Sequence, residues 1–344
     1  MESLSFKLKG LPTAIGSMPH TDPKKACDVV MESLSQIPVW PQMPNRTFLE
    51  NMYAQYSEKL PGVILEDERI YVDRSVDFSG EMERLYAAYI ENAVDEYAIS
   101  YEYAPGFYEF LKQDFNSALA IKGQVTGPIS FGLVVTDQDR RPTLYDDTLA
   151  DAIARHLKLK AAWMEKELAK RCSKTIIFID EPYLASLGSA FVALDNEKVI
   201  ELTNEVLAGL NGLTGMHCCG NTDWSVLMAT EIDILNFDAY NHGESLALYP
   251  DELKAFLGRG GTLAWGIVPS EEETLPNENA ESLLKRLDTI MDSLVAKGIE
   301  RNALLDQCLI TPSCGLGSIS VAMAERALRL TREVSEAFRN NQKT

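Results

Sequence analysis

Short apolar segments that alternate with helical segments along the whole chain limit what this sequence can fold into. Eight runs are rich in apolar or β-branched residues, and most of them do not alternate with polar residues: 13–18, 37–42, 118–124, 174–180, 213–218, 232–237, 262–267 and 308–313. Such runs are typical of parallel strands that are covered on both faces. Segments with a helical pattern lie between them, including 80–97, 146–171, 196–212 and 278–298.

The repeated strand–helix order predicts an α/β protein that folds as a single (β/α)8 TIM barrel. An open doubly wound sheet is the alternative, although no GxGxxG motif follows an early strand. Residues 62–74, GVILEDERIYVDR, have the length of a β-hairpin, which we expect to be an insertion after the second strand. No repeat or flexible linker marks a boundary, so we expect one domain over residues 1–344.

The charge balance argues against two classes of partner. The chain has 32 Lys and Arg against 51 Asp and Glu, and its net charge of -19 repels nucleic acids and anionic membranes. The N-terminal MESLSFKLKGLP has no signal-peptide pattern, and no apolar run approaches the roughly 18 residues of a membrane span. We therefore expect a cytoplasmic protein whose six cysteines are thiols or metal ligands rather than disulfides.

The ends of the predicted strands carry polar and metal-binding side chains. In a TIM barrel the active site forms at the C-terminal ends of the strands. The seventh strand ends in apolar Ile267 and Val268, whereas the other seven end in the following residues: Gly16 and Ser17, Gln42, Gln124 with Thr126, Asp180 with Glu181, His217 with Cys219, Asp238, and Cys314. The sequence therefore predicts a polar site at one rim of the barrel.

A metal site is predicted where His217, Cys218 and Cys219 follow one another. His217 and Cys219 are two residues apart on an extended segment, so they face one side while Cys218 faces the other. Cys314 can reach the same centre, and Asp238 is a natural oxygen ligand. Zinc favours thiolate and imidazole ligands. The alternative is that cysteines at strand ends are small buried core residues, as we interpret Cys27, Cys172, Cys218 and Cys308.

Several segments resemble the motifs of a known family. GMHCCGNTDW, ILNFDAY and TPSCGLGS are similar to the zinc motifs of the catalytic domain of cobalamin-independent methionine synthase. That family belongs to a superfamily shared with uroporphyrinogen decarboxylase. AIGSMPHT, KGQVTGPISFG and FIDEPYL resemble three further motifs of the family, and the matches extend from residue 14 to residue 318.

The resemblance implies a zinc-dependent methyltransferase that transfers a methyl group to the thiol of homocysteine and forms methionine. It implies four zinc ligands, namely His217, Cys219, Cys314 and, where the family has Glu, Asp238. His242 or Glu244 is the alternative to Asp238. The resemblance also assigns the homocysteine carboxylate to Ile15, Gly16 and Ser17, and its ammonium group to Asp180.

Besides Asp238, three further positions depart from the family pattern. Gln42, which we include among the substrate-binding residues, stands where a carboxylate is expected. Val268 stands in place of a proton-donating histidine, and Ser186 in place of a glutamate that contacts folate. The full enzyme of the family also carries an additional N-terminal barrel, which these residues do not include.

These departures lead to expectations about the methyl donor and the acceptor. Methyl-folate needs a proton on its leaving nitrogen, so we expect a methylated corrinoid, free or on a partner protein, as the donor. Three alternatives remain open for the function: methyl transfer to another small thiol such as coenzyme M, a uroporphyrinogen decarboxylase-like lyase, and a non-catalytic barrel that binds zinc or a ligand.

Overall fold

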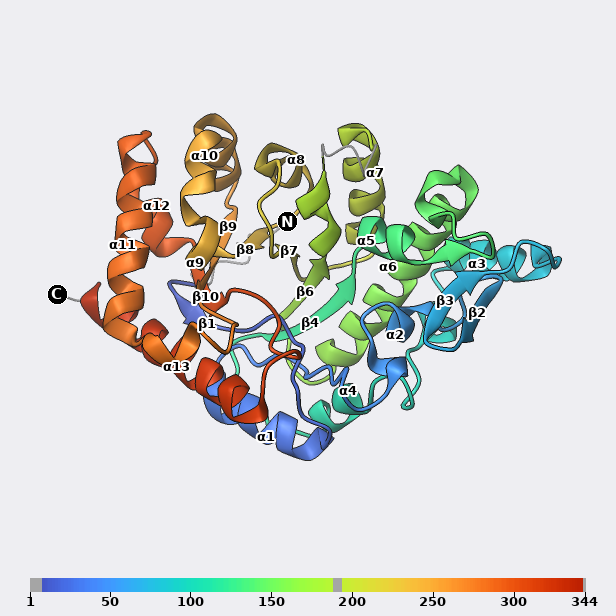
Figure 1. Ribbon diagram of the computed structural model, residues 1–344, viewed down its shortest axis with the longest axis horizontal. Coiled ribbons are helices and arrows are strands. Elements are labelled where there is room, and N and C mark those ends of the chain that lie inside the picture. The colour runs from blue at the N-terminus through green and yellow to red at the C-terminus, as the bar shows by residue number, and fades with distance from the viewer. Residues whose placement is uncertain (1–7, 188–193, 343–344) are drawn as a thin grey trace.

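A curled sheet of parallel strands forms the centre of the protein (Figure 1). The structure, a computed structural model, describes residues 8–187 and 194–342. Seven strands pair in the order β1-β10-β9-β8-β7-β6-β4. Their bounds are Leu11–Pro12 (β1), Ile121–Thr126 (β4), Thr175–Asp180 (β6), Leu213–Cys218 (β7), Ile234–Phe237 (β8), Thr262–Val268 (β9) and Cys308–Pro312 (β10). From β10 to β4 the neighbours in this sheet are successive among its strands, and the first strand, β1, pairs with the last, β10. This order is typical of a barrel and not of a doubly wound sheet.

Segment 37–42 connects the two edge strands of the curled sheet. Val39 forms a parallel bridge with Lys122 of β4, and Gln42 forms one with Ser17, just after β1. The backbone N–H of Gln42 also donates to the carbonyl of Gly16 over 3.0 Å. The arrangement is consistent with the predicted TIM-like barrel. Six predicted strands coincide with β4 and with β6 to β10. Segments 13–18 and 37–42 contain no regular strand and pair only through isolated bridges at Ser17, Val39 and Gln42.

Helices surround the sheet (Figure 1). Their bounds are Pro23–Ser33 (α1), Ala54–Ser57 (α2), Ser79–Glu91 (α3), Pro105–Phe110 (α4), Pro128–Val134 (α5), Asp147–Ala169 (α6), Asn196–Leu207 (α7), Trp224–Ala229 (α8), Ala239–His242 (α9), Pro250–Gly258 (α10), Ala280–Ala296 (α11), Arg301–Asp306 (α12) and Val321–Asn341 (α13). The predicted helix 80–97 ends early because Asn92 adopts a left-handed conformation with φ of 51°. No helix in the described ranges is long and apolar enough to cross a membrane.

A small second sheet lies where the sequence predicted a hairpin. Strands β2 (Val63–Glu66) and β3 (Arg69–Val72) pair antiparallel, and β5 (Thr136–Asp137) lies parallel to β3. Asp67 and Glu68 connect β2 and β3, and both have positive φ, as two-residue hairpin turns require. Whether this hairpin is an insertion into a shared barrel plan stays a prediction.

The core has two parts, and the smaller one fills the interior of the curled sheet. It contains Leu8, Leu11, Ile37, Ala120, Ile176, Phe178, Ile234, Ala264 and Leu309. The larger part lies between the sheet and the helices. Inward positions alternate along each strand, so Ile176 and Phe178 of β6 are followed on the same face by Asp180. The apolar interior thus lies beneath the strand ends, where polar side chains collect.

One buried cation does not belong to this polar rim. Lys160 of α6 is fully buried, and its Nζ has no hydrogen-bond partner within the described residues. Burial lowers the pKa of Lys160 to about 7, and the charge of Glu58 opposes this shift only in part. An unfolded lysine keeps its proton up to a pH of about 10.4. Between these two pH values the unfolded chain therefore binds more protons than the folded protein, and this lysine destabilises the fold most at and below pH 7.

We therefore expect Lys160→Met to raise the free energy of unfolding at pH 7 by about 1–4 kcal/mol. The gain should shrink towards pH 10, because the unfolded wild-type chain then loses the same proton. Urea unfolding at the two pH values measures this. Lys158→Met is the matched control: Lys158 forms an ion pair with Glu205 over 2.9 Å, so its loss should not stabilise the protein. A gain that is equal at both pH values would contradict the explanation.

Candidate metal centre and active site

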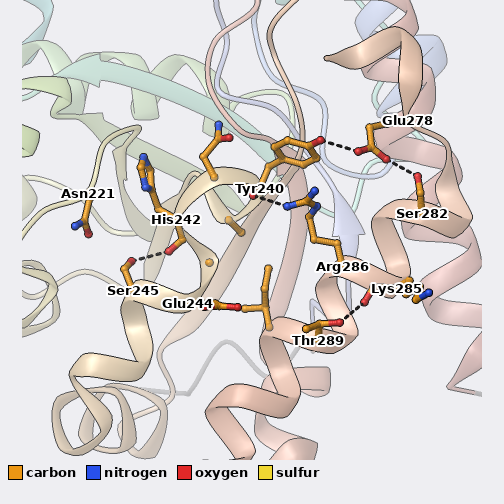
Figure 2. Close-up of a pocket in the computed structure, with 14 residues that line it drawn as sticks. Asn221, Tyr240, His242, Glu244, Ser245, Glu278, Ser282, Lys285, Arg286 and Thr289 are labelled. Atoms are coloured by element: carbon orange, nitrogen blue, oxygen red, sulfur yellow. Dashed lines mark hydrogen bonds between the residues drawn. The ribbon is translucent and has the colours of Figure 1, made fainter. Parts of the chain in front are cut away.

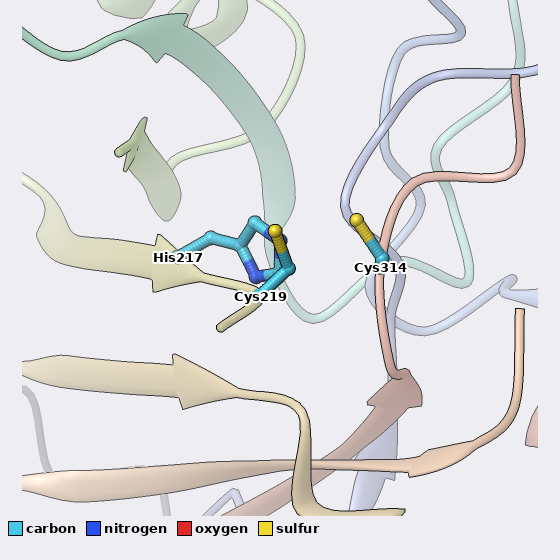
Figure 3. A group of neighbouring side chains, drawn as sticks. All are labelled: His217, Cys219 and Cys314. Carbon is cyan, nitrogen blue, oxygen red and sulfur yellow. The ribbon is translucent and has the colours of Figure 1, made fainter. Parts of the chain in front are cut away.

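His217, Cys219 and Cys314 form one cluster at the C-terminal ends of β7 and β10. One ligand atom from each residue lies within 4.8 Å of the others. Figure 3 shows His217 and Cys219 side by side at the end of β7, with Cys314 facing them from the loop after β10. An imidazole and two sulfurs are the donors that zinc favours. The fold therefore brings together three of the four residues that were predicted as zinc ligands.

Cys218 lies on the other side of β7, as the alternation along the strand predicts. Its side chain is fully buried in the larger core, among the apolar residues between the sheet and the helices. Burial is the main cause that raises the pKa of Cys218 to about 12. Cys218 is therefore a protonated core thiol, and only its two neighbours in the sequence face the cluster.

The cluster stabilises one cysteine as a thiolate. A hydrogen bond from Cys314 and then the neighbouring His217 lower the pKa of Cys219 to about 4, against the opposing effect of burial. The pKa of Cys314 is raised, first by that same hydrogen bond and then by burial. Thiolates are the form of cysteine that binds metals. One metal-binding sulfur is thus already charged at neutral pH.

His217 is held by a residue that the sequence did not single out. Its Nδ1 lies 2.5 Å from Oδ1 of Asn236 in β8, and the two residues are paired across the sheet. Its Nε2 is buried and has no hydrogen-bond partner among the described residues. The signal in the sequence was an amide in the middle of the buried strand ILNF, because a buried polar group needs partners.

A cavity of about 420 Å³ opens beside the cluster. Seven residues that the sequence predicted for the site line it: Ile15, Ser17, Gln42, Asp180, His217, Cys219 and Cys314. Further lining residues come from the loop after segment 37–42, such as Asn45 and Glu50, and from the loop after β10, such as Gly315 and Gly317. Residues from distant parts of the sequence thus surround one space of a size that suits a small ligand.

Gly16 lies between two cavity-lining residues, Ile15 and Ser17, but does not line the cavity itself. Its φ of +144° is unfavourable for residues with a side chain, and an added Cβ would lie 2.2 Å from Nε2 of Gln124. Next to it, the carbonyl of Ile15 accepts a hydrogen bond of 2.7 Å from Nζ of Lys122. Lys122 is a fully buried residue of β4 that the sequence analysis did not select. Gly16 and Lys122 together fix the backbone conformation that places Ile15 and Ser17 at the cavity.

Asp180 brings a carboxylate to the cavity wall. It ends β6, where it is paired in register with His217 of β7. Its Oδ1 is buried and has no hydrogen-bond partner in the described part of the chain. Burial raises the pKa of Asp180, and the nearby His217 and Lys122 oppose that shift. A buried carboxylate oxygen without a donor is suited to a cationic group on a ligand.

Gln42 lines the same cavity, and its amide nitrogen already donates two hydrogen bonds within the protein. Its Nε2 donates to Oε1 of Gln55 over 2.7 Å and to the hydroxyl of Tyr56 over 3.1 Å. Tyr56 in turn donates to the carbonyl of Gln124 over 2.5 Å. The side chain of Gln42 therefore offers its carbonyl oxygen, and no charge, to a ligand.

Asp238 and its two predicted substitutes lie outside the cluster. The carboxylate of Asp238 caps α9, where it accepts from the backbone N–H of Asn241 over 2.9 Å and from its side-chain amide over 2.8 Å. His242 and Glu244 line a different cavity of about 620 Å³ beside α11. Figure 2 shows this cavity with Tyr240 and Arg286 at its wall. The cluster thus has three protein donors within 4.8 Å of one another.

The position that the resemblance reserves for a proton-donating histidine is apolar. Val268 ends β9 and is fully buried. Neither Val268 nor Ser186 is among the residues that line the cavity beside the cluster. The nearest polar group along the chain, Ser270, shares a hydrogen bond of 2.9 Å with Ser313. The chain therefore has no acid at the position where the family pattern places one.

Comparisons with known proteins place the fold among methyltransferase structures. No profile of a known protein family matches the sequence, and no curated protein matches it in sequence. A B12-independent methionine synthase from Shewanella sp. W3-18-1, solved in complex with selenomethionine, superimposes with a TM-score of 0.62. The two share 17% identity, and the match covers 98% of this chain and 99% of that chain.

A methyltransferase from Methanosarcina mazei is also similar, with a TM-score of 0.58 and 14% identity. That match covers 98% of this chain and 95% of the other. At these identities the likeness establishes the fold. This is the fold that the motif resemblance implied, and both structural superpositions cover nearly the whole chain.

Proposed function

We propose that this protein is a zinc-dependent methyltransferase that transfers a methyl group to the thiol of homocysteine and forms methionine. One observation carries the proposal: a His-Cys-Cys cluster and the residues predicted to bind an amino acid line the same cavity. The similarity of the fold to a methionine synthase and to a second methyltransferase supports it. Fold alone does not determine function, so the donor atoms of the cavity are the stronger support.

The donor set fits zinc. His217, Cys219 and Cys314 would supply one nitrogen and two sulfurs, which leaves one of four positions for a substrate thiol. Bound zinc would deprotonate that thiol and keep it nucleophilic at neutral pH. Asp238 is the candidate for a fourth protein ligand, but it would have to give up its hydrogen bonds with Asn241.

The protein's own contribution to the reaction is orientation. The substrate sulfur forms a bond to the methyl carbon while the bond between the methyl group and its donor breaks, and the donor keeps that electron pair. The thiol proton is lost to solvent when the thiolate forms. Ile15, Ser17 and Asp180 line the cavity that holds the thiolate. They would fix the carboxylate and ammonium groups of homocysteine, so that sulfur and methyl carbon meet in line.

Asp180→Asn is expected to weaken homocysteine binding by roughly 10- to 100-fold, because it removes a charge-assisted contact of about 1.5–3 kcal/mol. Zinc content should stay at the wild-type value, since Asp180 is not part of the donor cluster. Isothermal titration of the zinc-loaded proteins with homocysteine measures the change. Unaltered affinity would show that Asp180 does not bind the ammonium group of homocysteine and would favour a different thiol as the acceptor.

A second thiol acceptor is favoured by one observation. Gln42 presents a neutral amide at the cavity. A second carboxylate at this position would bind the ammonium group of an amino acid more strongly. A thiol without an ammonium group, such as coenzyme M, would not need that charge. Methyl-transfer assays with homocysteine and coenzyme M at equal concentration decide between the two. Faster turnover of coenzyme M would replace homocysteine in the proposal.

For the methyl donor we propose a methylated corrinoid, either free or bound to a partner protein. Apolar Val268 at the position of the expected acid and the net charge of -19 support this choice over a folate with a polyglutamate tail. The Shewanella structure is described as B12-independent, so methyl-folate is the competing donor.

A further inference from the structure

We propose that Asn236 is a positioning residue that determines which nitrogen of His217 binds the metal. The inference rests on the proposed metal centre. It goes beyond that proposal by assigning a role to a buried residue that makes no contact with the cavity. The support comes from the hydrogen bonds of one side-chain amide, which connects three strands of the sheet.

The orientation of the Asn236 amide is fixed by its surroundings. Its Nδ2 donates to the carbonyl of Ala264 in β9 over 3.0 Å and to Oγ1 of Thr311 in β10 over 2.8 Å. A backbone carbonyl can only accept, so the NH2 group must face Ala264. Oδ1 of Asn236 consequently faces His217, at 2.5 Å from Nδ1.

This orientation defines the tautomer of the histidine. An amide oxygen can only accept, so Nδ1 of His217 has to carry the proton of that hydrogen bond. In a neutral imidazole the lone pair then resides on Nε2. Nε2 is the buried ring nitrogen that has no hydrogen-bond partner among the described residues, and it is free to bind the metal.

The same amide links the two halves of the cluster. His217 is on β7, whereas Cys314 follows β10, so the donors come from segments about a hundred residues apart. Asn236 bonds to His217 and also to Thr311, which lies three positions before Cys314. Asn236 is fully buried, and each of its polar atoms has a partner. Such partners orient metal-binding histidines, and their loss typically weakens metal affinity by about 10- to 100-fold.

The tautomer can be measured directly on the wild-type protein. In 15N-labelled protein loaded with cadmium-113, NMR should show Nε2 of one histidine coupled to cadmium and a proton on Nδ1 of the same ring. Cadmium coupled to Nδ1 would overturn the inference. This measurement needs no variant, so it decides the matter even if a substitution at position 236 prevents folding.

The role of the amide is tested by zinc affinity, measured by competition with a chelator. Asn236→Leu removes the acceptor while keeping a side chain that branches at the same atom, and it should weaken zinc binding by about 10- to 100-fold. Asn236→Asp keeps an acceptor for Nδ1 but loses the donor to Ala264, so its affinity should lie between those of wild type and Asn236→Leu. Thr311→Val removes one partner of the amide but leaves the contact with His217, and it serves as the matched control.

Equal losses in Asn236→Leu and Thr311→Val, or no loss in Asn236→Leu, would contradict the positioning role. Failure of the proposed function looks different, because wild-type protein would then bind neither zinc nor cadmium at the cluster. Wild-type zinc binding that Asn236→Leu leaves unchanged would reject this inference alone.

Discussion

Replacing Cys219 with serine is expected to remove the metal and the methyl-transfer activity together. Cys219 is the thiolate of the cluster, with a pKa lowered to about 4 by Cys314 and His217. A serine hydroxyl stays protonated at neutral pH and is a poor zinc ligand. Zinc content, measured by mass spectrometry of the purified protein, should fall from about one per chain to near zero. Methionine formation should fall below detection.

Cys218→Ser is the matched control, because it changes the adjacent residue to the same amino acid. Cys218 is fully buried among apolar side chains on the other side of β7. We expect wild-type zinc content and activity. The only cost should be in stability, about 1–3 kcal/mol for a hydroxyl group in an apolar environment. Equal loss of zinc in both variants would refute the conclusion that Cys219 faces the cluster while Cys218 faces the core.

With homocysteine as acceptor, we expect methylcobalamin to give methionine and methyl-folate triglutamate to give none. A methyl group on cobalt leaves without a proton, whereas the folate nitrogen must be protonated as it leaves. Val268 stands where the family resemblance places the acid, and its buried apolar side chain supplies none. The tail of the folate is also repelled by a chain with a net charge of -19.

The cavity does contain two other carboxyl groups, and they define the competing outcome. Asp180 is assigned to the acceptor, and Glu50 accepts a hydrogen bond from Arg46 over 2.9 Å, which keeps it in an ion pair. Burial nevertheless raises the pKa of Glu50, so it is the residue to test if folate proves active. Efficient turnover with methyl-folate and none with methylcobalamin would overturn the donor assignment.

Much of the barrel could be predicted because buried parallel strands leave a strong sequence signal. Runs such as KTIIFID and TLAWGI are apolar on both faces, and they correspond to β6 and β9. Six of the seven site residues that line one cavity were expected there because strand ends share a rim, and Ile15 came from the family resemblance. Sequence position was thus sufficient to assemble the cluster from segments about a hundred residues apart.

Other features depend on contacts that the sequence does not reveal. The segments 13–18 and 37–42 are apolar like the others, yet they pair only through isolated bridges at Ser17, Val39 and Gln42. The φ of +144° at Gly16 departs from strand geometry. Asn236 and Lys122 were missed because each is a single buried polar residue within an apolar run, whereas the sequence analysis selected residues at strand ends. Asp238 was predicted as a ligand from its place after β8, but it caps α9. Local capping competes with metal binding for the same carboxylate.

Zinc X-ray absorption with and without homocysteine tests the central claim most directly. The claim is that a metal held by His217, Cys219 and Cys314 binds the thiol that accepts the methyl group. Without substrate, the spectrum should show two sulfurs at about 2.3 Å from zinc. Homocysteine should add a third sulfur at a similar distance. A sulfur count that stays the same when homocysteine binds would contradict the account.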